Sequence, residues 1–135
     1  MRFPMTKCEQ PVLFQSAIEA GFPSPADDVV EQELDLNAFL IKRPAATFFL
    51  RVRGDSMIKA GIHEGDILIV DRSLEPGDRK IVIASVNGEL TVKRLSLKKQ
   101  EVFLVAENDA FPAMRITPEQ EMKIWGVVTT VIHPV

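Results

Sequence analysis

The sequence has one cysteine, two histidines and no long apolar run. With Cys8 alone, the chain can form neither an internal disulfide nor a cysteine-based metal cluster. No apolar segment approaches the roughly 18 residues of a membrane-spanning helix, and the N-terminal residues lack the continuous apolar stretch of a secretory signal. We therefore expect a cytoplasmic protein without a membrane anchor.

The chain also lacks an excess of positive charge. Its formal net charge is -3, which provides no general attraction to nucleic acids or anionic membranes. Fewer than fifty residues precede the β-rich region and prolines interrupt them, so we expect no helix-turn-helix there. Direct sequence-specific DNA binding has neither a motif nor a basic surface to support it. A chain of 135 residues is about the length of one domain.

Two regions differ in composition. Residues 1–45 are rich in proline and small residues, which is typical of a flexible arm, whereas residues 46–135 contain short β-rich runs separated by glycine, Asn-Gly and Pro-Gly turns. Several closely spaced short strands predict a mostly β domain of the sandwich or barrel-like type. Asn87-Gly88 predicts a tight hairpin, so the strands on either side of it should be antiparallel neighbours.

Within the arm, a weak helical pattern ends at Ala20-Gly21, and the Phe-Pro-Ser-Pro segment after it should be exposed and bendable. Residues 25–41 have a spacing of apolar residues that fits either a short amphipathic helix or an extended edge strand. The acidic residues of this segment should form a solvated face: Asp27, Asp28, Glu31, Glu33 and Asp35.

Ser56 lies in a Gly-Asp-Ser-Met turn and is either a surface hydroxyl or a nucleophile. A serine nucleophile needs a base, usually a histidine that an acid orients. Neither His63 nor His133 has an obvious acidic partner at a recognisable spacing, so a Ser-His-Asp triad is not favoured. Lys93 is a different candidate base. Strand alternation puts Thr91, Lys93 and Leu95 on one face, and the simplest interpretation of this stretch alone is that Lys93 and Arg94 straddle a solvated edge strand.

The two candidate stretches together resemble a known family. Residues 51–95 are similar to the catalytic core of the LexA/UmuD family of self-cleaving Ser-Lys peptidases, the S24 class. The resemblance includes Gly54-Asp55-Ser56-Met57, the Gly-Ile-x-x-Gly-Asp stretch at 61–66, the strand that ends at Asp71, the Asn87-Gly88 hairpin and Lys93 in Thr-Val-Lys-Arg-Leu.

Upstream, residues 20–57 resemble the UmuD branch of this family, including the Gly-Phe-Pro-Ser-Pro run that follows the scissile bond there. The resemblance covers roughly residues 19–131. Ala20 matches the Ala-Gly sites of LexA-type proteins, whereas the UmuD branch carries cysteine at this position. Both residues are small, so the departure should not harm cleavage.

The resemblance implies a role for each matching residue. Ser56 is the nucleophile, Lys93 the general base and Ala20-Gly21 the scissile bond, while the backbone N-H groups of Asp55 and Ser56 form the oxyanion hole. It implies no cofactor and no metal ion. In the family, a RecA filament on single-stranded DNA stimulates cleavage as a co-protease. The trimmed homodimer then serves as accessory subunit to a UmuC-like translesion polymerase of the Y family.

Two alternatives belong to other functional classes. The chain could be mainly a non-catalytic dimeric module that binds the polymerase, although both Ser56 and Lys93 are present. Signal peptidases use related Ser-Lys chemistry, but they need a membrane anchor and have no internal Ala-Gly site. The missing apolar span argues against this second alternative.

Overall fold

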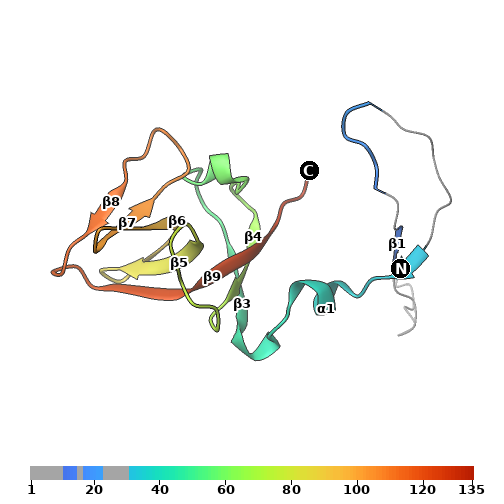
Figure 1. The fold of residues 1–135 in the computed structure, drawn as a ribbon, viewed down its shortest axis with the longest axis horizontal. Coiled ribbons are helices and arrows are strands. Elements are labelled where there is room, and N and C mark those ends of the chain that lie inside the picture. Colours follow the sequence, from blue (N-terminus) through green and yellow to red (C-terminus); the bar gives the residue numbers. More distant parts are fainter. Residues whose placement is uncertain (1–10, 15–16, 23–30) are drawn as a thin grey trace, which may run out of the picture. The chain divides into compact units, whose positions relative to one another are not determined.

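The computed structural model describes residues 11–14, 17–22 and 31–135, and it divides the chain into two compact units, Met1–Lys42 and Arg43–Val135 (Figure 1). As predicted, the protein is mostly β. None of the helices in this described part has the length and apolar composition of a membrane-spanning segment.

The first unit contains a small antiparallel strand pair and one short helix. Strand β1 (Val12–Phe14) pairs with β2 (Glu31–Glu33), and the backbone N-H of Leu34 donates to the carbonyl of Pro11. Helix α1 (Leu36–Leu40) follows and is capped by the carboxylate of Asp35, which accepts from two backbone N-H groups.

This unit corrects one prediction and resolves another. The helical pattern before Ala20 was wrong for residues 12–14, because strand pairing with β2 overrides a weak local periodicity. The segment 25–41 was predicted to be either a helix or a strand. Its described part, residues 31–41, contains both, because β2 is an extended strand and α1 is a helix. Glu31, Glu33 and Asp35 are exposed as expected, and Asp27 and Asp28 lie outside the described residues.

The second unit is built on a seven-stranded antiparallel sheet in the order β3-β4-β9-β5-β6-β7-β8. The strands are β3 (Thr47–Arg51), β4 (Ile67–Asp71), β5 (Ile81–Val86), β6 (Glu89–Lys98), β7 (Glu101–Val105), β8 (Met114–Ile116) and β9 (Met122–Ile132). Two short 3-10 helices, η1 (Pro44–Ala46) and η2 (Ile58–Ala60), complete the unit. The predicted hairpin is confirmed: β5 and β6 are antiparallel neighbours joined at Asn87-Gly88, and both turn residues have positive φ.

Strand β9 runs between β4 and β5 (Figure 1). It contains two register shifts, one against each neighbour. Such bulges bend a strand and increase its twist. Gly126 lies between them, where an added Cβ would come within 2.6 Å of Val70 Cγ1 and 3.0 Å of the Asp71 carbonyl oxygen. Only a residue without a side chain allows β9 to approach β4 this closely.

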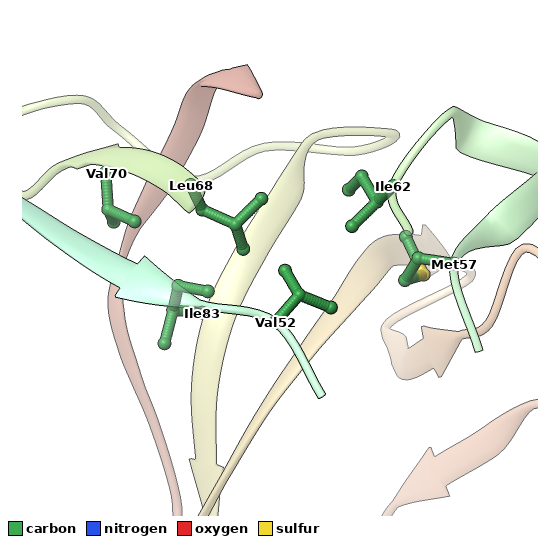
Figure 2. Packing of buried hydrophobic residues seen from close by; sticks show 6 residues of the cluster. All are labelled: Val52, Met57, Ile62, Leu68, Val70 and Ile83. Carbon is green, nitrogen blue, oxygen red and sulfur yellow. The ribbon is translucent and has the colours of Figure 1, made fainter. Parts of the chain in front are cut away.

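The core consists of two buried clusters. One cluster contains residues from β4, β5 and the segment after β3, and Figure 2 shows its side chains: Val52, Met57, Ile62, Leu68, Val70 and Ile83. The other contains Val82, Ala84, Leu95, Leu104 and Val127. The first cluster positions the site, because Met57 follows Ser56 directly and is only 1% exposed.

Candidate active site

Ser56 lies in a tight loop between β3 and η2 that is anchored on both sides. Val52 and Met57 are buried before and after it, and Figure 2 shows Met57 close to Ile62. Gly54 has φ +88°, a left-handed conformation that favours glycine. The apolar anchors and this glycine turn the chain so that the half-buried Ser56 side chain faces the sheet.

Polar contacts hold the same loop from outside. The Asn108 side-chain amide donates to the carbonyl of Asp55 at 2.9 Å, and the backbone N-H of Gly54 donates to Glu64 at 3.3 Å. Within residues 31–135, the backbone N-H groups of Asp55 and Ser56 have no protein acceptor. These two donors are therefore available to an incoming oxygen atom, as an oxyanion hole requires.

Lys93 extends from β6 to the hydroxyl of Ser56. Its Nζ lies 3.0 Å from Ser56 Oγ, 2.9 Å from Thr91 Oγ1 and 3.1 Å from the carbonyl oxygen of Val92. The interpretation of Lys93 as part of a solvated edge strand is wrong, because β6 lies between β5 and β7 and the side chain is half-buried.

Burial lowers the pKa of Lys93, because desolvation disfavours the ammonium form. Three acceptors satisfy the three donors of a charged ammonium group. When the amine is neutral, its lone pair can instead accept the hydroxyl proton of Ser56. The arrangement accommodates both protonation states, which is what a base that exchanges a proton needs.

Thr91 is a site residue to which the sequence interpretation assigned no role. Strand alternation correctly put Thr91 and Lys93 on one face of β6, and the structure adds the hydrogen bond between their side chains. That bond fixes the direction of a long, flexible lysine side chain toward Ser56.

A cleft of about 450 Å³ opens beside Ser56 and Lys93. Its apolar wall contains side chains from β3, β4, β5, β6 and the β7–β8 connection, namely Leu50, Leu68, Ile83, Leu90, Val92 and Phe111. Its polar side contains the Ser56 loop and Thr91. An apolar cleft with a few convergent polar groups is the usual form of a binding site.

The histidines occupy a different place from the one a triad needs. The sequence showed no obvious orienting acid for either histidine, but the structure brings both to Asp66: His133 Nδ1 lies 2.6 Å from Asp66 Oδ1, and His63 donates its backbone N-H to Asp66 Oδ2 at 2.7 Å. Burial alone would raise the pKa of Asp66, but these contacts outweigh it and lower the pKa. In the described residues Ser56 is bonded to Lys93 and to neither histidine.

Ala20 and Gly21 lie in the first unit, in a bend within the connection from β1 to β2. Both are exposed, and a Cβ added to Gly21 would meet nothing within 4 Å. Among the residues that the structure describes, nothing therefore packs against the Cα of Gly21.

Comparison with known proteins gives concordant matches. The family described as Peptidase S24-like matches residues 11–129. Protein SamA of Salmonella typhimurium strain LT2 is 53% identical over 90% of this chain and 84% of its own length. Protein ImpA of Escherichia coli is 52% identical over 90% of this chain and 82% of its own. The LexA repressor of Shewanella piezotolerans is 40% identical over 86% of this chain and 56% of its own.

Proposed function

Because the chain belongs to the peptidase S24-like family, we propose that it is a self-cleaving serine endopeptidase of the SOS response to DNA damage. In this proposal residues 1–45 are the substrate arm and residues 46–135 the peptidase domain. The observation that carries it is the 3.0 Å contact between Lys93 Nζ and Ser56 Oγ beside an apolar cleft.

The reaction begins when the arm enters the cleft and Lys93 is neutral. Lys93 accepts the hydroxyl proton of Ser56, and Ser56 Oγ attacks the carbonyl carbon of Ala20. The backbone N-H groups of Asp55 and Ser56 stabilise the resulting oxyanion. Lys93 then donates its proton to the amide nitrogen of Gly21, and the C-N bond breaks to leave Ala20 as an ester on Ser56.

A water molecule completes the cycle. Lys93, neutral again, accepts a proton from that water, which attacks the ester carbonyl. The serine hydroxyl is regenerated and the carboxyl end of Ala20 is released. Thr91 holds Lys93 in line for both proton transfers, and small residues at positions 20 and 21 let the arm backbone approach the nucleophile.

Docking of the arm also changes the pKa of the base, Lys93. An arm laid over the cleft excludes water from Lys93, and further desolvation lowers its pKa further. Cleavage is then slow until something favours the docked state. By family resemblance, a RecA filament on single-stranded DNA is that trigger.

The trimmed product acts after cleavage. We propose that it remains a homodimer and becomes the accessory subunit of a UmuC-like Y-family translesion polymerase. The RecA filament and the polymerase both act on DNA, so the proposal implies that this protein is cytoplasmic. In the alternative function, a mainly non-catalytic polymerase-binding module, the arm would stay intact under inducing conditions.

One experiment separates these functions. The purified chain is incubated with RecA filament assembled on single-stranded DNA and a nucleotide, and the fragments are weighed by mass spectrometry. The proposal expects a single break between Ala20 and Gly21 that Ser56→Ala abolishes. An intact chain, or a break elsewhere, would refute it.

A further inference from the structure

A cluster of ligand-type side chains lies outside the candidate active site. It consists of His63, Asp66 and His133. The β4–β9 ladder creates it, because Ile67 pairs with Ile132, so that Asp66 just before β4 and His133 just after β9 meet at one end of the pair. A tight turn stabilised by the Asp66 N-H to His63 carbonyl bond brings His63 to the same point.

Both imidazoles turn their Nδ1 atoms toward one carboxylate. His133 Nδ1 lies 2.6 Å from Asp66 Oδ1, and His63 Nδ1 lies 3.7 Å from Asp66 Oδ2. The two rings stack with centroids 4.3 Å apart. All three potential donor atoms lie within 4.8 Å of one another.

One of these atoms has no hydrogen-bond partner among the described residues. His63 Nδ1 is inaccessible to solvent and forms no hydrogen bond with any described residue. A buried polar nitrogen without a partner is costly and calls for an explanation. A hydrogen-bonded link between His133 and Asp66 accounts for two members of the cluster, but it leaves this nitrogen unsatisfied.

From this geometry we propose that His63, Asp66 and His133 bind one divalent first-row transition metal ion of the zinc type. Imidazole nitrogens favour Zn²⁺, Ni²⁺ and Cu²⁺, whereas Mg²⁺ and Ca²⁺ favour all-oxygen sites. Bond lengths of about 2.1 Å in a tetrahedral site put neighbouring donor atoms about 3.4 Å apart. The present distances of 2.6 and 3.7 Å bracket that value, so small rotations of the side chains complete the site.

An ion can reach the cluster when the partly exposed histidine side chains rotate. The carboxylate is 1% exposed and therefore preorganised, while both imidazoles are 41% exposed. Three protein ligands leave a fourth position for water. The bound ion joins the end of β9 to the turn before β4, so it should stabilise the fold, and the stabilisation should grow with the logarithm of the free ion concentration once the site is filled.

The test uses the full chain, expressed without a histidine tag, and ZnCl₂ as the titrant. Because the sequence has only two histidines, the imidazole signals in an NMR spectrum report the site without any mutation. We expect one Zn²⁺ per chain, displacement of both imidazole signals at one equivalent, and a higher thermal midpoint. If neither signal or only one moves, the three-residue site is refuted.

Variants provide the second measurement, by calorimetric titration with folding checked by circular dichroism. His63→Gln and His133→Gln should each weaken Zn²⁺ binding by at least about tenfold, since even loss of an outer-shell partner has an effect of that size. Cys8→Ser and Glu89→Gln, which change the only thiol and an exposed acid outside the cluster, should bind as the wild type does. Equal affinity in the histidine variants, or loss of binding in Cys8→Ser, would overturn the proposal.

Discussion

The pH dependence of self-cleavage is the sharpest test of Lys93 as the base. An exposed lysine has a pKa of about 10.4, so only about one in a thousand is neutral near pH 7.4. Burial lowers the pKa of Lys93 from that value. Without a filament, the rate should therefore rise about tenfold per pH unit and then level off below pH 10.4.

The assay follows fragment formation by the purified chain from neutral to strongly alkaline pH. Ser56→Ala serves as the blank for alkaline hydrolysis, and circular dichroism identifies the pH range in which the protein stays folded. A histidine base would reach its plateau near its usual pKa of about 6.5. A folded protein whose Ser56-dependent rate is already flat from pH 7 upward would refute the lysine mechanism.

Thr91 extends this test, because its hydroxyl accepts a hydrogen bond from Lys93 Nζ. A hydrogen bond to a charged group is worth about 1.5–3 kcal/mol, equivalent to about 1–2 pKa units. The neutral amine can also donate to Thr91, so we expect less than the full effect. Thr91→Val should move the plateau to lower pH by up to about one unit, while Thr91→Ser leaves it in place. A plateau at the same pH in both variants would remove Thr91 from the control of this pKa.

Three further predictions concern the nucleophile and base, the arm and the sheet. Ser56→Ala and Lys93→Ala should each fold and dimerise but produce no fragments with RecA filament, and normal processing in either variant would exclude the dyad. Gly21→Glu should block cleavage of its own arm, because a bulky side chain hinders entry into the cleft. The Gly21→Glu protein should still cut the arm of a Ser56→Ala chain if arms dock between subunits. If the Ser56→Ala chain stays intact in the mixture, cleavage is strictly intramolecular. Gly126→Val should lower the free energy of unfolding, measured by urea denaturation, by about 1–3 kcal/mol, since its Cβ would lie 2.6 Å from Val70 Cγ1. In the matched control Gly21→Val, the added Cβ meets no described atom within 4 Å, so the unfolding midpoint should stay unchanged.

Local signals in the sequence were sufficient for part of the fold. Asn87-Gly88 predicted the β5–β6 hairpin, because a two-residue turn depends on the φ angles of its own residues. Alternation along β6 put Thr91 and Lys93 on one face, because side-chain direction in a strand has a period of two and is likewise a local property. The weak helical pattern in the arm failed at Val12–Phe14, where pairing with the distant strand β2 prevailed: Val12 lies opposite Glu33 and Leu13 lies opposite Gln32.

The sequence by itself, through its family resemblance, determined which residues we propose to carry the chemistry: the Gly-Asp-Ser-Met turn, the lysine of β6 and the small residues at 20 and 21. Only the tertiary structure decided which side chains meet. Strand pairing brings Lys93 to Ser56 across 37 residues and His133 to Asp66 across 67. No local spacing encodes such contacts, because they depend on the order and register of strands in the sheet. Lys93 was recognisable as the partner of Ser56 only because a family motif contains it. No such motif marked Asp66, the buried carboxylate between the two histidines.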